Sequence, residues 1–417
     1  MRILVLSPYL PHRRVGHGGG TAVRDLLGWL ARQHEVTAAC LVRPGEEGLV
    51  DDVRALGVAV EGLPFADRSA AGAHRFGFWQ HRLAAAARAT ASGYPYFAEK
   101  YRTAALAARV ADIVERTRPE AVQIEYLQLA LHCRDLRRLP DAVRPRLILN
   151  THELGSLPRE RRAEIATDPW RRWIARREAA RWRRLQVAAC GWADRTLCVT
   201  EQDRVLLEAM GGRRLSTVPL GMDLEAVRAD WDPPADGCRI LFVGSFSHGP
   251  NRSGARQLLE VVWPRVRAAR PEATLELAGR GSDTFLATLG GAATWSAQGV
   301  TALGYVDDLA PLFRRCHAFA APLTEGGGIK IKVLEALARG VPVVTTAVGA
   351  EGIATGDSTA LCVASPDAGF AEALLQVATD GNLAHTLAAG GRRLMEERFG
   401  WAAITGRLTR IYSGLPD

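Results

Sequence analysis

The chain is organised around the segment APLTEGGGIKIKVLEAL, residues 321–337. It leads from an apolar strand end, through three glycines, into a segment with helical period. Glycines let backbone N–H groups approach a ligand without a Cβ in between, and a helix start adds unpaired N–H donors and the positive end of its dipole. Lys330 and Lys332 add charge, and Glu335 can accept hydrogen bonds from sugar hydroxyls. We interpret the stretch as a cradle for a phosphorylated sugar or a nucleotide; the alternative is a plain glycine-rich turn.

Apolar runs and helical segments alternate on both sides of this stretch. In the C-terminal half the expected strands are Arg239–Val243, Thr274–Ala278, Val300–Leu303, Ala318–Ala321, Val341–Thr345 and Ala360–Val363. In the N-terminal half they are Arg2–Ser7, Val36–Val42, Val58–Leu63, Ala121–Ile124, Arg146–Asn150 and Arg195–Thr200. Continuous apolar runs are typical of parallel strands buried on both faces. The alternation predicts an α/β protein with two doubly wound domains in tandem, whose ligands gather at the carboxyl ends of the strands.

Length and composition agree with two domains and leave the ligand open. A chain of 417 residues with 47% hydrophobic residues can bury two large cores. We expect a first domain at 1–217, a second at 218–398, and a final helix at 399–417 that returns to the first domain. The net charge of +8 suits nucleic acid, an anionic membrane or phosphorylated ligands, and does not choose among them.

The cysteines and the apolar segments bear on the compartment. Seven scattered cysteines without a C-x-x-C pair predict buried, reduced thiols in the cytoplasm, and neither a zinc site nor a disulfide framework. The apolar run that follows Met1 is too short for a signal peptide. Because no run reaches about 18 apolar residues, we expect no transmembrane helix.

Two features of the N-terminal half are candidates for ligand contact. The pattern Gly16-x-Gly18 resembles a dinucleotide fingerprint, but the loop after Ser7 is too long, and Arg43 follows the second strand where an acid would be needed. A backbone cradle at Gly18–Gly20 remains a hypothesis. His152 follows the strand Arg146–Asn150, at the edge where chemistry is expected, although a lone histidine is often structural.

A basic helix is expected at residues 168–190. It contains seven arginines and the tryptophans Trp170, Trp173 and Trp182, and Asp168 followed by Pro169 is a good start signal. Such a helix can lie on an anionic membrane. Because the arginines occur on most sides, we favour the alternative, a solvated helix whose tryptophans pack on the domain.

Six motifs, in order, carry a family resemblance. They are Val199-Thr200-Glu201 with Asp203, Val218-Pro219-Leu220-Gly221-Met222-Asp223, Phe242-Val243-Gly244-Ser245 with Pro250-Asn251, Leu277-Ala278-Gly279-Arg280-Gly281, Gly304-Tyr305-Val306, and the segment from Pro322 to Val344. This pattern resembles the retaining glycosyltransferases of family 4, which have the GT-B fold of two Rossmann-like domains facing a cleft. The resemblance covers essentially the whole chain and is strongest over 195–352.

The resemblance implies an N-terminal domain for the acceptor and a C-terminal domain for a nucleotide-sugar donor. It implies catalytic roles for His152, beside the donor sugar, and for Lys330, at the diphosphate. Glu335 would bind the ribose hydroxyls. The other residues implied at the donor are Gly18, Gly19 and Gly20 at the diphosphate and reacting sugar, Tyr305 and Val306 at the nucleobase, Gly327, Gly328 and Ile329 at phosphates and sugar hydroxyls, and Gly244, His248, Asn251, Arg280, Glu325, Gly326 and Lys332.

Two departures from the family pattern concern the donor. The family often has a glutamate eight positions before the ribose glutamate, where this chain has Gly327, and Glu325 lies two positions too early. The chain resembles a Gly-Gly-Gly-x-Lys-x-Lys subgroup that lacks that glutamate. The family's Arg and Lys after the first C-terminal strand are also missing. We therefore assign the diphosphate to Lys330 first and Lys332 second.

The reaction implied is transfer of a sugar to an acceptor hydroxyl with retention, without a metal or a cofactor other than the nucleotide sugar. The acceptor would be a glycan, a lipid-linked compound or a small molecule. The enzyme would be cytoplasmic, with peripheral contact at the inner face of the membrane as an option. The rivals are a nucleotide-sugar epimerase of the same fold and a basic nucleic-acid- or membrane-binding protein; we expect no nucleic acid.

Overall fold

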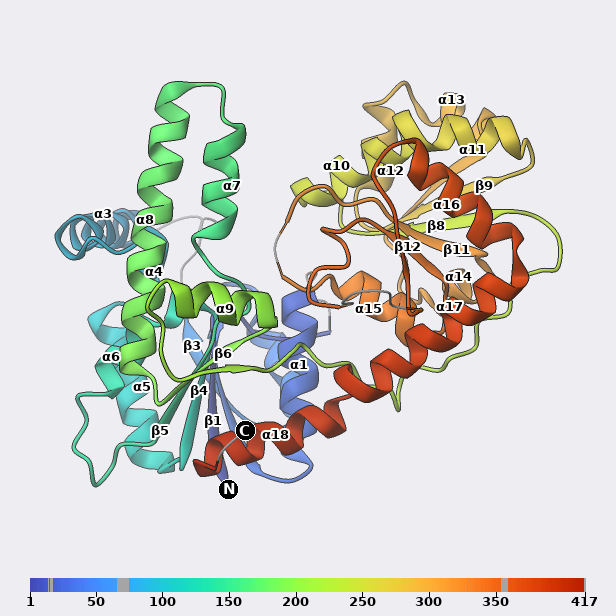
Figure 1. The fold of residues 1–417 in the computed structure, drawn as a ribbon. Helices are drawn as coiled ribbons and strands as arrows, with labels where there is room; N and C mark the ends of the chain where they lie inside the picture. Colours follow the sequence, from blue (N-terminus) through green and yellow to red (C-terminus); the bar gives the residue numbers. More distant parts are fainter. Residues whose placement is uncertain (14, 16–17, 66–74, 327, 354–358, 416–417) are drawn as a thin grey trace. The chain divides into compact units, whose positions relative to one another are not determined.

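The computed structural model describes residues 1–13, 15, 18–65, 75–326, 328–353 and 359–415. The chain forms two compact units (Figure 1). Unit 1 consists of Met1–Gly221 with Trp401–Asp417, and unit 2 of Met222–Gly400. The C-terminal helix α18 (Trp401–Ser413) therefore belongs to unit 1.

Unit 1 is built on a parallel sheet in the order β3-β2-β1-β4-β5-β6-β7. Its strands are β1 (Arg2–Ser7), β2 (Glu35–Val42), β3 (Ala59–Pro64), β4 (Ala121–Glu125), β5 (Arg146–Asn150), β6 (Arg195–Cys198) and β7 (Leu215–Thr217). The expected strands are all present. β7 was not predicted, because a three-residue strand with Ser216 and Thr217 gives no apolar run.

The helices of unit 1 cover both faces of its sheet. They are α1 (Gly18–Ala31), α2 (Val50–Arg54), α3 (Arg75–Ser92), α4 (Tyr96–Lys100), α5 (Ala104–Thr117), α6 (Leu131–Leu136), α7 (Leu157–Ile165), α8 (Pro169–Trp192), α9 (Glu201–Ala209) and α18, with short 3-10 turns η1 (Glu47–Leu49) and η2 (Leu127–Leu129). The first turn of α1 contains Gly18–Gly20, the segment for which a backbone cradle was hypothesised. α7 was not predicted, because its sequence LPRERRAEI has no apolar stripe.

The sheet of unit 1 separates two cores. On β1, Ile3 and Val5 pack with α1 and α18, whereas Leu4 and Leu6 pack with α5, α6 and α8. Successive side chains of a strand point to opposite faces, so one continuous apolar run supplies both layers. Helices therefore cover both faces of the sheet, as predicted for a doubly wound domain.

Unit 2 has a second parallel sheet in the order β10-β9-β8-β11-β12-β13. Its strands are β8 (Arg239–Val243), β9 (Thr274–Ala278), β10 (Val300–Gly304), β11 (Ala318–Ala321), β12 (Val343–Thr345) and β13 (Cys362–Val363). Its helices are α10 (Gly249–Gln257), α11 (Trp263–Ala269), α12 (Ser282–Ala287), α13 (Ala292–Ala297), α14 (Ala310–Arg315), α15 (Ile331–Ala338), α16 (Ala368–Thr379) and α17 (Gly381–Leu394), with π-turns η3 (Leu258–Val262) and η4 (Met395–Phe399). The fold class, two Rossmann-like parallel sheets, is confirmed.

The helices and the cysteines bear on the expectations for membrane spans and disulfide bonds. In the described part of the chain, no helix is long and apolar enough to cross a membrane. All seven cysteines are free, and six of them are buried.

Candidate functional site

Glycines at the carboxyl ends of β8 and β9 let these strand ends approach each other closely. Gly279 has a φ of +134°, and a Cβ on it would lie 2.1 Å from the carbonyl oxygen of Gly244. A Cβ on Gly244 would lie 2.8 Å from Nζ of Lys332 and 2.9 Å from Cγ of Asn251. Any larger residue at either position would force a shift. The structure thus brings Gly244, Asn251 and Lys332 together.

Lys332 presents a partly buried amine at these strand ends. Its Nζ donates to Oδ1 of Asn251 at 2.5 Å, and Nδ2 of Asn251 donates to the carbonyl oxygen of Ser245 at 2.8 Å. The same Nζ lies 5.0 Å from the ring centroid of Phe242. Burial, and to a smaller extent the charge of Lys330, lowers the pKa of Lys332 to about 7. An anion bound here would restore the charge of the amine.

Lys330 lies just before α15, with an extended backbone. Its Nζ donates to the carbonyl oxygen of Gly328 at 2.5 Å and lies 3.6 Å from Oε2 of Glu351. Gly326 and Gly328 have φ values of +113° and +68°, which favour glycine. Ile329 is buried, and the predicted Gly327 lies outside the described residues. Lys330 therefore lies close to the carboxylate of Glu351, in the segment after β12.

Glu335 lies on α15, one turn after Lys332. Its Oε1 accepts from Nη2 of Arg339 at 3.2 Å. Burial raises the pKa of Glu335, and the charge of Arg339 opposes this shift. The carboxylate is thus held by one arginine on its own helix.

The remaining predicted donor residues of unit 2 are more exposed. Tyr305 is 58% exposed, and the guanidinium of Arg280 lies 5.6 Å from its ring centroid. Val306 is half-buried. His248, immediately before α10, and Glu325 are both exposed. An exposed aromatic ring with a cation over it offers a flat surface for stacking.

In unit 1, a buried carboxylate holds His152. Because β4 and β5 pair in register, Glu125 lies opposite Asn150. Oε2 of Glu125 pairs with Nε2 of His152 and accepts from Nδ2 of Asn150 at 3.1 Å. Oε1 accepts from Nε2 of Gln123 at 2.5 Å, and Oε1 of Gln123 accepts from the hydroxyl of Tyr412 at 2.5 Å. A chain of hydrogen bonds thus runs from α18 to His152.

Tyr126 connects His152 to the glycines of α1. The rings of Tyr126 and His152 stack with centroids 3.7 Å apart and planes 2° apart. Both residues have positive φ, 69° and 56°, which is strained for residues other than glycine. A Cβ on Gly19 would lie 1.9 Å from the Tyr126 hydroxyl oxygen. Gly18 and Gly20 share the first turn of α1 with Gly19, and Gly19 and His152 both lie close to Tyr126.

A family model supports the assignment of unit 2. Residues 237–380 match the model described as glycosyl transferases group 1. This part of unit 2 is thus similar to the group 1 glycosyltransferases. The match covers β8 to β13 and includes the residues around Lys332.

Part of the chain is also similar to two mannosyltransferases. The chain is 32% identical over 174 residues to a GDP-mannose-dependent monoacylated alpha-(1-6)-phosphatidylinositol monomannoside mannosyltransferase of Corynebacterium glutamicum, covering 40% of this chain and 45% of that one. It is 26% identical over 213 residues to a phosphatidyl-myo-inositol mannosyltransferase of Mycobacterium leprae, covering 49% and 55%. The chain thus spans about half the length of each relative.

Solved structures resemble the whole chain. Sucrose-phosphate synthase from Thermosynechococcus elongatus matches with a TM-score of 0.73 and 18% identity over 99% of both chains. WaaG, a glycosyltransferase involved in lipopolysaccharide biosynthesis, matches with a TM-score of 0.64 and 16% identity over 99% of this chain and 100% of that one. HepE of Anabaena, solved in complex with UDP, matches with a TM-score of 0.67 and 14% identity over 100% of both. These likenesses establish the fold, which is the expected GT-B fold.

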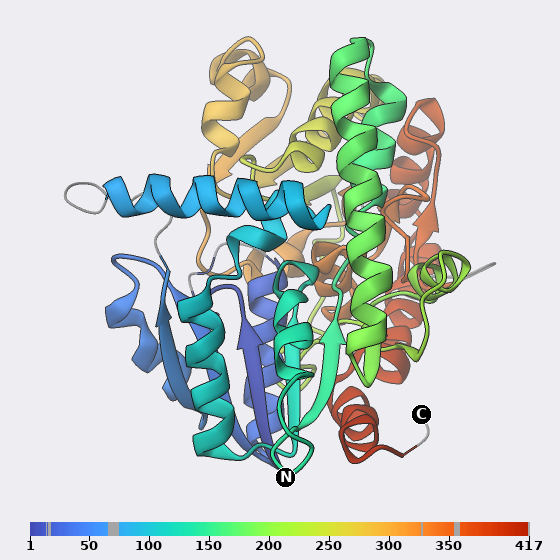
Figure 2. The same ribbon diagram turned by 90° about the vertical axis from the view of Figure 1, so that its left-hand side faces the viewer.

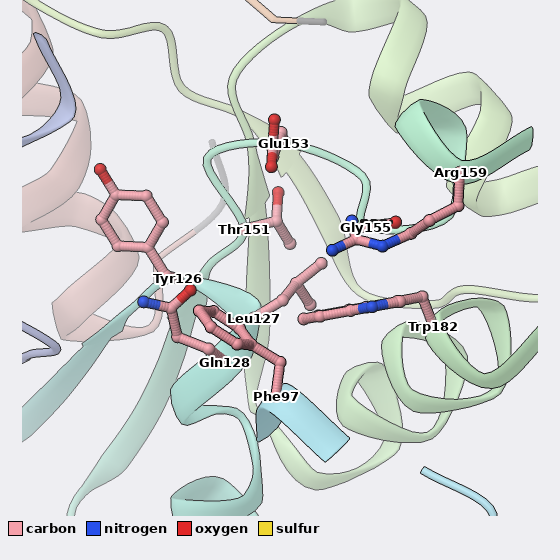
Figure 3. A pocket seen from close by; sticks show the side chains of 9 residues that line it. All are labelled: Phe97, Tyr126, Leu127, Gln128, Thr151, Glu153, Gly155, Arg159 and Trp182. Carbon is pink, nitrogen blue, oxygen red and sulfur yellow. Dashed lines mark hydrogen bonds between the residues drawn. The ribbon is translucent and has the colours of Figure 1, made fainter. Parts of the chain in front are cut away.

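In unit 1, a pocket that is open to solvent, with an empty volume of about 340 Å³, lies beside His152 (Figure 3). Tyr126, Thr151 and Glu153 form its side nearest to His152. Arg159 lies over Trp182, 4.6 Å from the ring centroid, and its Nη1 donates to the carbonyl oxygen of Gly155 at 2.7 Å. Phe97, Leu127, Gln128, Gly155 and Trp182 also line the pocket. It combines apolar rings with a carboxylate, an amide and a guanidinium.

Several residues near the candidate sites of unit 1 and unit 2 could not be predicted from the sequence. Glu125, Tyr126 and Gln123 lie in or after an apolar strand and carry no motif. Glu351 follows β12 with no spacing signal. Asp230-Trp231-Asp232 has Asp-x-Asp spacing and was overlooked, but Asp232 pairs with Arg314 at 3.4 Å. Among the described residues, no group of three or more His, Cys, Asp or Glu side chains could hold a metal.

Proposed function

We propose that this protein is a retaining glycosyltransferase that takes a sugar from a nucleotide-diphosphate donor. The observation that carries the proposal is the partly buried Lys332 amine, held against Gly244 and Asn251 at the strand ends of the segment that matches the group 1 model. A desolvated cation beside glycine backbone is suited to a diphosphate. Unit 2 would bind the donor, and unit 1 would supply His152 and the acceptor pocket.

The contacts of Lys330 and Lys332 favour Lys332 over Lys330 as the main ligand of the diphosphate. Lys330, the first choice from sequence, already lies near Glu351 and donates to Gly328. The amine of Lys332 donates to the neutral amide of Asn251, and no carboxylate of the described residues forms an ion pair with it. We therefore propose Lys332 as the principal diphosphate ligand. Lys330 keeps a catalytic role beside the glycine turn, where its charge reaches the leaving group.

The other donor residues retain the roles proposed from sequence. Glu335 would accept the two ribose hydroxyls, and the exposed Tyr305 with Val306 would hold the base. The remaining proposed contacts with phosphates and the donor sugar are Gly18, Gly19, Gly20, His248, Arg280, Glu325, Gly326, Gly327, Gly328 and Ile329.

The chemical step needs stabilisation of two charges. The bond between the anomeric carbon and the diphosphate oxygen breaks, which leaves negative charge on the diphosphate and positive charge on the sugar ring. Lys332 and the N-terminus of α15 stabilise the first charge. The acceptor oxygen bonds to the anomeric carbon on the same face, and its proton passes to a diphosphate oxygen. His152, fixed by Glu125 and Tyr126, stabilises the ring charge.

We propose that the acceptor is a lipid-linked compound bound at the pocket beside His152. The two relatives act on phosphatidylinositol-based lipids by name. The Trp182 and Phe97 rings provide apolar surface for a sugar or cyclitol ring, and Glu153 and Gln128 provide hydrogen bonds to hydroxyls. The six buried free thiols suit the reducing cytoplasm.

Titration calorimetry with UDP, GDP and ADP tests the donor site. One diphosphate should bind best, and Glu335→Ala should weaken it about 10- to 100-fold, because two charge-assisted hydrogen bonds are lost. Glu372→Ala, a change on α16 of the same unit, should leave affinity unchanged. Affinity that is unaltered by Glu335→Ala would remove this residue from the ribose role.

Incubation of the donor without an acceptor distinguishes a glycosyltransferase from a nucleotide-sugar epimerase. An epimerised sugar without transfer would contradict the proposal.

A further inference from the structure

The hairpin of α7 and α8 ends in an exposed apolar tip. Both views show the hairpin extending from the unit 1 sheet, with the turn between its helices at the far end (Figures 1 and 2). At this tip Ile165 is 74%, Trp170 65%, Trp173 48% and Ile174 42% exposed. Further along the same helix, Trp182 is buried in the core of unit 1. The expectation that the tryptophans pack on the domain is right for Trp182 and wrong for Trp170 and Trp173.

Local contacts fix the shape of this tip. The side chain of Asp168 accepts from the backbone N–H of Arg171 at 2.7 Å and caps α8. The guanidinium of Arg172 donates to the carbonyl oxygen of Ala166 at 2.7 Å and closes the turn. The Trp170 and Trp173 rings stack with centroids 4.9 Å apart. The two indoles are therefore presented as one preformed apolar surface.

The tip is strongly basic. Between residues 161 and 177 there are six arginines and two carboxylates, an excess of four positive charges out of the chain's +8. Arg171, Arg176 and Arg177 are exposed, and the guanidinium of Arg177 lies 5.2 Å from the Trp173 ring centroid. Apolar rings bordered by arginines match the apolar interior and the anionic headgroups of a lipid surface.

We propose that the tip of the α7–α8 hairpin docks on an anionic lipid bilayer. Trp170, Trp173, Ile165 and Ile174 enter the interface between headgroups and acyl chains, and the arginines contact lipid phosphates. Indole rings are favoured at this depth because they are amphipathic. The inference needs no assumption about the reaction, so it stands or fails independently of the proposed transferase activity.

Vesicle co-sedimentation of the full chain tests the proposal. The protein should bind vesicles of phosphatidylcholine with about one third phosphatidylglycerol at least tenfold more tightly than pure phosphatidylcholine, and added salt should weaken binding. Trp170→Ser with Trp173→Ser should lower the affinity at least tenfold. Trp79→Ser is the matched control, because Trp79 on α3 is 54% exposed and lies under Arg82 but belongs to another surface. Arg171→Glu with Arg176→Glu should remove the preference for anionic vesicles.

Three outcomes would overturn the proposal. The first is that the wild type does not bind vesicles, or that Trp79→Ser loses as much vesicle affinity as the tip variant, Trp170→Ser with Trp173→Ser. The second is a dimer in solution that the tip variant converts to monomer, which would assign the tip to a second copy of the chain. The third is salt-dependent binding of single- or double-stranded DNA that is lost in the arginine variant while vesicle binding persists. Circular dichroism of each variant verifies that the hairpin is folded.

Discussion

At the scale of single residues, the most constrained group of unit 1 is the pair Tyr126 and His152. Two non-glycine residues with positive φ follow neighbouring strands, and their rings stack. Such strain persists only where surrounding contacts hold it, and it is concentrated at functional sites. Here Glu125, Gln123 and Tyr412 supply those contacts through buried hydrogen bonds. We infer that Glu125 is a positioning residue, which orients His152 and selects its tautomer.

Glu125→Gln tests this positioning role. The amide N–H would face Nε2 of His152 and drive the imidazole proton to Nδ1, whereas the size of the side chain is kept. Turnover should fall about 10- to 100-fold with nucleotide affinity unchanged, as for other residues that orient a ligand. Nitrogen NMR of the imidazole should report the change of tautomer. The control is Glu61→Gln, because Glu61 lies on β3 of the same sheet and the change removes only an ion pair with Arg116. Equal turnover in the two variants would refute the positioning role of Glu125.

The lowered pKa of Lys332 leads to a prediction on proton uptake. With a pKa of about 7, the amine is mostly neutral at pH 8 in the free protein. A bound diphosphate favours the charged form, so binding at pH 8 should take up about one proton. Calorimetry of nucleoside diphosphate binding in buffers of different ionisation enthalpy measures this number. Lys332→Met should abolish the uptake and Lys330→Met should retain it; the reverse would return the diphosphate to Lys330.

At the scale of elements, α18 ties the end of the chain to unit 1. Trp401, Ile404, Leu408, Ile411 and Tyr412 are buried in the core that α18 shares with α1. A final helix at 399–417 that returns to the first domain was expected from the sequence. The sequence did not predict that the last turn would supply a hydrogen bond to Gln123, 289 residues away. Such pairings depend on the register between distant elements.

Two substitutions on α18 should have opposite effects on the unfolding of unit 1. Leu408→Ala creates a cavity in a closed core and should lower the free energy of unfolding by about 2–4 kcal/mol. Gly406 is exposed on the same helix, and a Cβ there would meet nothing within 4 Å. Gly406→Ala should therefore raise the free energy of unfolding by about 0.5–1 kcal/mol. Urea unfolding followed by tryptophan fluorescence measures both, and a neutral Leu408→Ala would contradict the packing of α18.

At the scale of the whole molecule, apolar runs were sufficient to predict both sheets, because parallel strands buried on two faces leave a clear pattern. The proposed donor site of unit 2 could also be predicted, because Gly244, Lys332 and Glu335 lie in glycine-rich strand ends and in the helix that follows. The site of unit 1 was not. His152 was found by its position after β5, but its partner Glu125 lies 27 residues earlier inside a buried strand. α7 and β7 were missed because their short, polar sequences resemble loops.

The central claim is that this chain transfers a sugar from a nucleotide diphosphate to an acceptor hydroxyl. The direct measurement is proton NMR of the protein with the nucleotide sugar selected by calorimetry, phosphatidylinositol vesicles and a metal chelator. We predict equal amounts of free nucleoside diphosphate and of a new glycoside with the donor's anomeric configuration, at a rate strongly reduced in Lys332→Met. A donor that remains intact, or whose sugar is epimerised without transfer, in the presence of this and other hydroxyl acceptors would contradict the account.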